Sequence, residues 1–474
     1  MIVWAVLVTP VLAGIVSWVT PRRRIVTLLA VLSPLVALAL GAILVAHTRS
    51  RVVEAPGLVR VDSLSALMVL LIATVGLIAG LRCGAVLEES PQRAGRTYAA
   101  LVQLFLAAMF GAVTSANLGV VWLMIEATTI TTSFLVAHRR SSRALEASWK
   151  YVVVCSLGIA VALLGLVILY FASAHATVAA RATLDVEGLI HLGPHLNSAV
   201  VRLGIALALI GFATKVGLAP FHSWLPDAHS QAPSPVSGLM SGVLLSVAFY
   251  ALVRVSSVAH AALGSHFART LLATLALVTL VVAAVLILAT RDVKRLLAYS
   301  SIEHMGLATL ALAAGTTAAV AAALFHLLGH GVVKSSAFLS AGEVSDLEHT
   351  TRLDEITGLL HRRPALGLRL GASLLALVGL PPFSLFLSEV LMTRAEISAG
   401  LAGPAVVQVL LVVAIGVATL NAAWPVFFGS GERASSSTRV WGVAGVALVA
   451  SLLLSVIGVP VTTFVESAAR AVGQ

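Results

Sequence analysis

Charged residues are scarce in this 474-residue sequence. Only 11% of the residues are charged, whereas 59% are hydrophobic. A soluble globule of this size could not bury so much apolar side chain, because much of any folded surface must contact water. The composition therefore excludes a soluble enzyme, a disordered regulator and a nucleic-acid-binding protein, in spite of a formal net charge of +10. The sequence predicts a protein embedded in lipid.

Cysteine and nucleotide-binding motifs are lacking too. The two cysteines, Cys83 and Cys155, lie too far apart for a CxxC unit, and two thiolates cannot hold an iron–sulfur cluster. Neither GxGxxG nor GxxxxGK[ST] occurs. We therefore expect no catalytic centre, cofactor or metal in this chain.

Fourteen stretches are apolar and long enough to cross a bilayer, which takes roughly 20 residues. They lie near residues 3–20, 25–46, 62–81, 98–115, 118–137, 146–171, 201–219, 233–256, 270–290, 299–315, 317–341, 365–398, 403–429 and 438–462. The predicted fold is an all-α polytopic membrane protein of about fourteen transmembrane helices.

Arginine and lysine are distributed unevenly between the predicted loops. Taken alternately, the loops on one side hold 18 of the 30 basic residues, in segments such as PRRR (21–24), HRRSSR (138–143) and GERASSSTR (431–439). Cytoplasmic loops carry such an excess. We expect a multi-pass protein of the bacterial cell membrane with both termini on the outer side.

Two interruptions take corresponding places in the predicted helix order. Helices four to eight and nine to thirteen form two five-helix units that enter the membrane from opposite sides. The fourth helix of each unit is broken, at Gly217 to Pro220 and at Gly379 to Pro382. Matching breaks in inverted repeats are typical of a transport site, whereas two ordinary proline kinks are the alternative. The predicted organisation is a three-helix segment (1–97), two repeats (98–256 and 257–430) and a C-terminal helix (431–474).

Lysine is rare, with four lysines against 26 arginines. Lys150, Lys215 and Lys334 fall inside apolar stretches, and only Lys294 falls in a predicted loop. A desolvated lysine can release its proton near neutral pH, but arginine cannot. Lysine in these places therefore indicates proton handling by Lys215 and Lys334. Lys150, about one turn inside its helix, has the alternative of reaching the membrane surface.

Glu126 is the one charged residue of the predicted fifth helix. A lone carboxylate in hydrocarbon stays protonated unless a cation approaches it. A glutamate–lysine pair about 6 Å apart is worth roughly 3 kcal/mol at an effective dielectric constant of 20. Separating the partners would then load or unload a proton. A static salt bridge between two helices is the alternative.

The predicted eleventh helix carries His326, His330 and Lys334 at intervals of four residues, so they share one helical face. Histidine titrates near neutrality, and such a row can relay protons with the help of water. A zinc site is the weaker interpretation, because no third ligand is evident in the sequence. Packing alone could also explain either histidine.

Other polar residues adjoin the breaks, and Glu303 and His304 lie near the cytoplasmic start of the predicted tenth helix. Glu389 follows the second break and suits a gate or exit for a proton, or else a helix-end carboxylate at the membrane surface. Further candidates for proton uptake or gating, which could equally be helix caps, anchors or loop residues, are Glu303, His304, His222, Asp227 and His229.

Four long motifs resemble the antiporter-like membrane subunits of respiratory complex I and membrane-bound hydrogenases. They are KVGLAPFHSWLPDAHSQAPSPVSGLMSG, RDVKRLLAYSSIEHMGLA, FHLLGHGVVKSSAFLSAGE and GLPPFSLFLSE. The motifs IEATT and AYSSIEHMG are most similar to component F of hydrogenase 4 and formate hydrogenlyase. The resemblance covers about residues 60–430 and implies a fourteen-helix proton-translocating fold with two inverted repeats.

The resemblance also implies roles for single residues. Glu126 and Lys215 match the paired charges of the family's fifth and seventh helices, and Glu389 matches its terminal charge. The central relay is matched by His326, His330 and Lys334. Many members carry a lysine in the eighth helix where this chain has Ser246. A relay to the centre would then need water, Ser246 or a histidine.

We interpret the chain as the proton-translocating subunit of a hydrogenase-4-like or complex-I-like oxidoreductase complex. Its expected partners are lipid, other membrane subunits and soluble redox subunits that carry clusters or nickel–iron. The alternatives are a subunit of a multisubunit cation/proton antiporter or of an inorganic-carbon uptake system, and a non-conducting scaffold.

Overall fold

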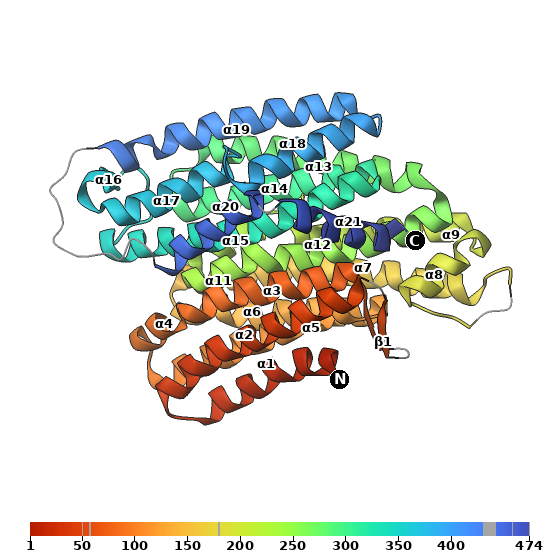
Figure 1. Cartoon of the computed structure of the whole chain (residues 1–474), viewed down its shortest axis with the longest axis horizontal. Helices are drawn as coiled ribbons and strands as arrows, with labels where there is room; N and C mark the ends of the chain where they lie inside the picture. The colour runs from red at the N-terminus through yellow and green to blue at the C-terminus, as the bar shows by residue number, and fades with distance from the viewer. Residues whose placement is uncertain (50, 56–57, 179–180, 430–441, 457, 474) are drawn as a thin grey trace.

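The computed structural model describes residues 1–49, 51–55, 58–178, 181–429, 442–456 and 458–473. Nearly all of them form helices that run along the long axis of the molecule (Figure 1). In these residues, twelve helices are long and apolar enough to cross a membrane, and two more are apolar but shorter. The predicted all-α polytopic membrane fold is confirmed.

The helices follow one another with short connections. Their bounds are Ile2–Val19 (α1), Arg23–Thr48 (α2), Ser63–Leu81 (α3), Cys83–Glu89 (α4), Gln92–Thr114 (α5), Leu118–Val136 (α6), Ser142–Ala174 (α7), Val186–Leu192 (α8), Ser198–Val216 (α9), Trp224–Gln231 (α10), Ser234–Leu239 (α11), Leu245–Leu263 (α12), Ser265–Ala289 (α13), Val293–Ala314 (α14), Thr317–Glu348 (α15), Leu359–Arg362 (α16), Pro364–Leu377 (α17), Ser384–Ser398 (α18), Ala402–Phe428 (α19), Val443–Val456 (α20) and Gly458–Gly473 (α21). The π-helix Met240–Leu244 (η3) joins α11 to α12.

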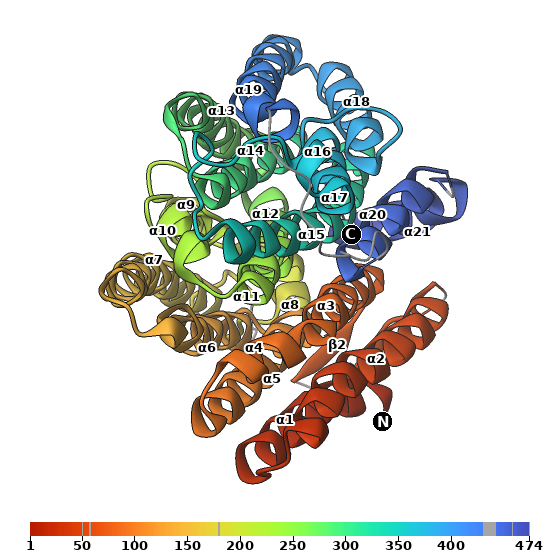
Figure 2. The ribbon, with the colours of Figure 1, turned by 90° about the vertical axis from the view of Figure 1, so that its left-hand side faces the viewer.

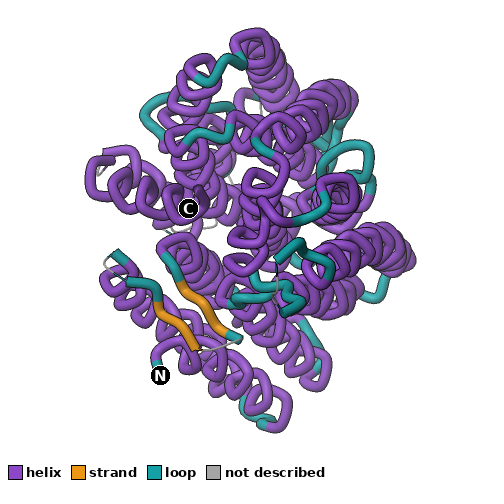
Figure 3. The backbone as a smooth tube through the Cα atoms, turned by 90° about the vertical axis from the view of Figure 1, so that its right-hand side faces the viewer, coloured by secondary structure: helices purple, strands orange, loops and turns teal. Residues whose placement is uncertain are grey.

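Two short strands, Val53–Ala55 (β1) and Val59–Val61 (β2), pair antiparallel between α2 and α3. Figure 3 shows this hairpin at the end of the molecule where α1 begins. The end of α21 lies on the same side (Figure 1). The two ends of the described chain therefore share one end of the helical bundle.

Both predicted interruptions are present. The helix α9 ends at Val216, Gly217 takes a φ of +85°, and α10 resumes at Trp224. In the same way α17 ends at Leu377, Gly379 takes a φ of +68°, and α18 resumes at Ser384. Glycine adopts this left-handed conformation without the steric penalty of a Cβ atom. The backbone thus leaves the helical path at the two places where the sequence predicted a break.

The most buried part of the fold is formed by α12, α14 and α15. Figure 2 shows them in the middle, with α1 and α2 at one edge and α13, α18 and α19 at the opposite edge. The apolar window of α11 to α12 is completely buried, and those of α14 and α15 are nearly so. Ionisable residues in the middle of these helices, such as His304, His330 and Lys334, are therefore shielded from lipid and water by the rest of the chain.

The structure corrects two boundaries. The tenth predicted helix starts at Val293, six residues before the expected residue 299, so Lys294 lies in the first turn of α14 and is buried rather than in a loop. The expected last helix, 438–462, is instead divided into α20 and α21. The basic loop 431–439 falls outside the described residues.

A cavity of about 1800 Å³ gathers arginines from loops that were predicted to be cytoplasmic. Its lining includes side chains from the α3–α4 connection, the start of α5 and the end of α6, namely Arg82, Arg93, Arg96, Arg139 and Arg140. Arg139 also lies 3.6 Å from Asp346 at the end of α15. These basic segments therefore lie at the same end of the molecule.

A buried ion pair joins α3 to α12. Asp62 caps α3 by accepting a hydrogen bond from the Ser65 amide, and Arg254 lies 2.6 Å from its carboxylate. Burial raises the pKa of Asp62, but the Arg254 guanidinium and the Ser65 hydrogen bonds outweigh it and hold this pKa below its usual value. The pair therefore stabilises the fold at pH values above the ordinary pKa of an aspartate side chain. Its contribution is lost as the pH falls through the lowered pKa of Asp62.

Replacing Arg254 with leucine is expected to destabilise the protein by about 3–5 kcal/mol, because Asp62 would stay buried without its cation. Thermal unfolding in detergent would measure the loss. Arg254→Leu combined with Asp62→Asn should recover much of it, since the remaining buried group is then neutral. An unchanged unfolding temperature for Arg254→Leu would contradict the importance of the pair.

Candidate proton-transfer site

Lys215 is completely buried at the end of α9. Its Nζ donates hydrogen bonds to the Thr129 hydroxyl of α6 at 2.8 Å and to the Tyr151 hydroxyl of α7 at 2.6 Å. Nζ also lies 4.5 Å from the centre of the Tyr151 ring. Tyr151 and Thr132 are themselves joined hydroxyl to hydroxyl at 2.5 Å. The amine is therefore held by hydroxyl groups, which can both accept and donate protons.

Glu126 lies on the same interface of α6 and α7, one turn before Thr129. One carboxylate oxygen accepts a hydrogen bond from Ser156 at 2.8 Å, and the other has no partner among the described residues. Among the described residues, Glu126 and Lys215 do not form a direct ion pair. The Lys215 amine is hydrogen-bonded to Thr129 and Tyr151 instead. Glu126 and Lys215, which the sequence predicted to be partners, therefore both contact the region between α6 and α7. Each of them is hydrogen-bonded to hydroxyl groups there.

Lys334 is the second completely buried lysine, on α15. Its Nζ donates to the Leu297 carbonyl at 2.7 Å and to the Ser300 hydroxyl at 2.8 Å, both on α14. Glu303, only 4% exposed, follows Ser300 by one turn of the same helix and interacts electrostatically with Lys334. The first half of α14 therefore supplies a hydroxyl and a carboxylate to the lysine of α15.

Three buried histidines cluster between α14 and α15. His304 Nδ1 lies 3.1 Å from His326 Nε2, and His326 Nδ1 lies 2.8 Å from the Ser388 hydroxyl of α18. The His304 and His330 rings are 5.1 Å apart between centres. Within the described chain neither ring nitrogen of His330 has a partner. Ser388, His326 and His304 thus form a short hydrogen-bonded row, and His330 lies beside it without a hydrogen-bond partner in the described chain.

His304 lies deeper than the sequence predicted. It was expected near the cytoplasmic start of its helix, but the earlier start of α14 at Val293 places it in the middle of that helix, where it is completely buried. It faces His326 across the contact between α14 and α15. The structure therefore brings His304 into the central cluster, together with two of the residues predicted for the relay.

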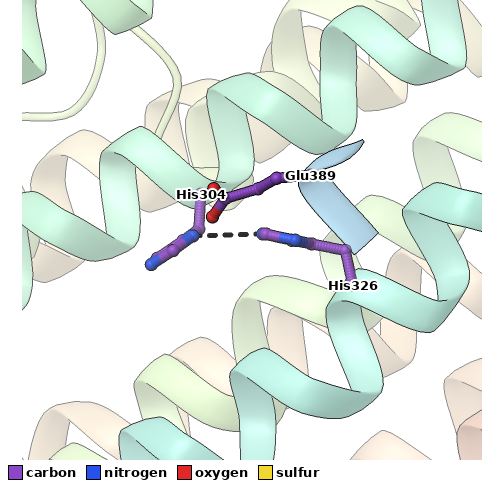
Figure 4. Close-up of side chains that lie close together, drawn as sticks. All are labelled: His304, His326 and Glu389. Atoms are coloured by element: carbon purple, nitrogen blue, oxygen red, sulfur yellow. Dashed lines mark hydrogen bonds between the residues drawn. The ribbon is translucent and has the colours of Figure 1, made fainter. Parts of the chain in front are cut away.

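Glu389 closes this cluster from α18. Figure 4 shows its carboxylate turned toward His304 and His326, and ligand atoms of the three residues lie within 4.8 Å of one another. A Cβ atom on Gly379 would overlap the Glu389 carboxylate. The second break therefore provides the space that lets Glu389 reach the histidines.

The same three residues are near enough to hold a metal ion. A metal would need both facing ring nitrogens free of hydrogen, yet His304 and His326 share a hydrogen bond. The hydrogen bond between the two rings is a contact through which a proton can be exchanged. The cysteines are equally ill suited to hold a cluster: Cys83 and Cys155 are buried, and burial raises the pKa of Cys83 to about 12, whereas cluster ligands are thiolates.

Asp227 of α10 links three helices. Its carboxylate lies 3.2 Å from Lys150 of α7 and 2.6 Å from Arg295 of α14. Lys150 is half exposed and also pairs with Glu146 at 2.7 Å. Asp227 and Lys150 therefore belong to a surface ion-pair network, next to the first break, and Lys150 is not part of the buried row.

The remaining predicted residues, His229, His222 and Ser246, differ in burial and in hydrogen bonding. His229 of α10 is completely buried; its Nδ1 is 2.8 Å from the Leu225 carbonyl, and its Nε2 has no partner in the described structure. His222 is partly buried in the first break. The Ser246 hydroxyl donates to the Gly242 carbonyl of its own helix, next to the π-helix η3. His229 is therefore better placed than Ser246 to exchange a proton.

Comparison with known proteins gives concordant matches. A family model described as "NADH:quinone oxidoreductase/Mrp antiporter, TM" matches residues 115–418. A hydrogenase-4 component F homolog of Methylacidiphilum infernorum is 37% identical over 345 residues, which cover 73% of this chain and 72% of that protein.

Solved structures agree over the whole chain. A chain of the membrane-bound sulfane sulfur reductase, an archaeal respiratory membrane complex, has a TM-score of 0.90 and 26% identity, covering 100% of this chain and 98% of its own. A chain of respiratory complex I from Thermus thermophilus has a TM-score of 0.82 and 27% identity, covering 100% of both. Both similar chains are parts of multisubunit membrane complexes.

Proposed function

Because this chain belongs to the membrane-subunit family shared by NADH:quinone oxidoreductases and Mrp antiporters, it is an antiporter-like subunit of a proton-translocating complex, and we propose that its buried lysines, histidines and glutamates carry the protons. The observation that carries this proposal is the series of ionisable side chains that leads from the buried Lys215, through buried histidines and Lys334, to the partly buried Glu389. Ionisable groups inside a membrane protein are costly, and they mark ion pathways.

The first part of the proposed path lies between α6, α7 and α9. Glu126 binds a proton near Ser156, and Lys215 exchanges protons with Thr129 and Tyr151. A movement that brings the Lys215 amine nearer to Glu126 stabilises both charges and so loads the lysine with a proton. Movement back to the hydroxyl groups weakens that stabilisation and releases the proton.

We propose that His229 connects this part to the centre in place of an eighth-helix lysine. The Trp224 ring lies 5.9 Å from Lys215 Nζ and 6.1 Å from the His229 ring. On its other side His229 is 5.6 Å from the Phe338 ring of α15, and it interacts electrostatically with His330. A histidine with an unpartnered Nε2 thus stands between the two halves of the path.

From the centre the proton passes along α15 and α14 to α18. Lys334, Glu303 and His330 receive it in this proposal, and the His326–His304 hydrogen bond transfers it toward Glu389. Moving one charge against the membrane potential costs about 2.3 kcal/mol per 100 mV. We propose that redox chemistry in partner subunits supplies this work. Those partners are soluble subunits with iron–sulfur clusters or nickel–iron, as in a hydrogenase-4-like complex, and the chain itself holds no redox cofactor.

We further propose a location in the bacterial plasma membrane with both termini on the outer side. The arginines that gather at one end, around the cavity between α4, α5 and α6, support this orientation because basic residues favour the cytoplasmic side. Proteolysis of tags at the chain ends in intact cells would test it.

The function is tested by redox-driven proton uptake into inverted membrane vesicles that contain the whole complex. Glu126→Gln is expected to lower uptake by about tenfold or more, because the amide cannot bind the proton. Electron transfer in the assembled complex should persist. Glu146→Gln, a change in the surface network, is the matched control and should leave uptake near the wild-type rate.

Two outcomes would contradict the proposal. Normal proton uptake by Glu126→Gln would remove the fifth-helix glutamate from the path. Proton movement that requires Na⁺ but no redox substrate would favour the cation/proton antiporter.

A further inference from the structure

The helix α18 carries a buried carboxylate, Glu396, which the path described above does not use. Glu396 is 0% exposed, and neither of its carboxylate oxygens has a hydrogen-bond partner among the described residues. An ionised carboxylate without a partner is strongly unfavourable in such surroundings. The group is therefore suited to hold a proton.

Glu396 lies on the same face of α18 as Glu389. The residues Glu389, Thr393 and Glu396 are spaced i, i+4 and i+7, so their side chains point in the same direction from one helix. At 1.5 Å per residue, Thr393 stands about 6 Å along the axis from Glu389 and about 4.5 Å from Glu396. A hydroxyl group thus stands between two carboxyl groups.

The Thr393 hydroxyl is oriented by α19. Gln408, which is 1% exposed, donates from Nε2 to Thr393 Oγ1 at 3.3 Å. The hydrogen bonds of the described residues give this hydroxyl a donor but no acceptor, which leaves its own hydrogen free to donate. The Gln408 carbonyl oxygen also has no partner in the described chain. The Gln408 side chain also interacts with the Glu396 carboxylate, so Gln408 lies beside both Thr393 and Glu396.

Glu396 also lies close to the end of the helix. The helix α18 ends at Ser398, which is exposed, and the backbone turns at Gly400 with a φ of +82° and no atom within 4 Å of where a Cβ would be. A proton that leaves Glu396 has about one helical turn to cross before it reaches this surface.

We propose that Glu396 is a further proton-binding site, the last before the exit, supplied by Glu389 through Thr393. The Glu389 O–H bond breaks as its proton moves to the Thr393 oxygen, and the hydroxyl's own hydrogen passes to a Glu396 oxygen. Glu389 is left as a carboxylate and Glu396 becomes a neutral carboxylic acid, so the net result is the movement of one proton along α18. The inference rests on the function proposed for Glu389.

The test compares Glu396→Gln with Glu396→Asp and Thr393→Val in the whole complex in inverted vesicles. Glu396→Gln has the size and neutrality of the protonated acid, so we expect normal assembly with at least tenfold slower proton uptake. Glu396→Asp should recover part of the rate, and Thr393→Val should slow uptake while Thr393→Ser does not. The matched control is Glu466→Gln, since Glu466 is half exposed and pairs with Arg470 on α21.

Infrared difference spectroscopy provides a second measurement that a purely structural role would not change. A neutral carboxyl group gives a carbonyl stretch that should disappear in Glu396→Gln and persist in Glu466→Gln. Normal uptake by Glu396→Gln, with uptake lost in Glu389→Gln, would overturn this inference and leave the proposed function intact. If both variants pump normally, the exit through α18 fails altogether. Transport that depends on Na⁺ through Glu396 would assign the site to a metal cation and would also overturn the inference.

Discussion

Replacement of Lys215 by alanine is expected to reduce redox-driven proton uptake by roughly 100-fold, the usual scale for removal of a group that transfers protons. The amine is completely buried and is held by Thr129 and Tyr151 alone among the described hydrogen bonds. Among the described residues, no other amine forms hydrogen bonds with these two hydroxyl groups. The measurement is acidification of inverted vesicles on addition of the complex's redox substrate.

Lys215→Arg separates proton transfer from a static charge. Arginine keeps the positive charge but does not release its proton in proteins, so this variant should be nearly as defective as Lys215→Ala. Arg470→Ala is the control because Arg470 is an exposed cation that pairs only with Glu466 of its own helix among the described ion pairs. If Lys215→Arg pumps at the wild-type rate, Lys215 acts as a fixed charge and the mechanism proposed for it is wrong.

Replacement of Gly379 by alanine is expected to have the second-largest effect. The left-handed conformation of Gly379 costs an L-residue about 1–2 kcal/mol, and the new Cβ atom would in addition overlap the Glu389 carboxylate. We expect Glu389 to be displaced from His304 and His326 and proton uptake to fall by about tenfold or more, on the scale of a lost proton-transfer group.

Gly400→Ala is the matched control for this change. Gly400 has a similar positive φ on the other side of α18, but no atom lies within 4 Å of the position of its Cβ. The substitution therefore imposes the same kind of backbone cost without the overlap. Equal losses of uptake in the two variants would show that backbone strain, and not the position of Glu389, is responsible.

The breaks and the buried charges were predictable from the sequence because each is a conspicuous exception within an apolar run. Glycine followed by proline in a helix of this kind, or a lysine such as Lys334 among valines and serines, is visible without a structure. The local chemistry is enough to indicate where the backbone bends and which groups are costly to bury.

The partners of these groups were not predictable in the same way. Tyr151, Thr129 and Ser300 are hydroxyl-bearing residues in helices that contain many others, and only the packing of α6, α7 and α14 selects them. Glu396 was missed because the sequence TRAEIS places it beside Arg394 at a helix end, where a surface position is expected. Its burial results from the cover that α19 and neighbouring helices provide.

The shared carboxylate of Asp227 has a mechanical consequence. It is bound at once by Lys150 of α7 and Arg295 of α14. Its own helix, α10, follows the irregular backbone after Gly217 and is joined to α9 by a hydrogen bond from the Trp224 indole to the Thr214 carbonyl. A displacement of α10 therefore moves the shared carboxylate relative to both cations at once. Through these contacts, movement of the short helix α10 would be transmitted between α7 in one half of the molecule and α14 in the other.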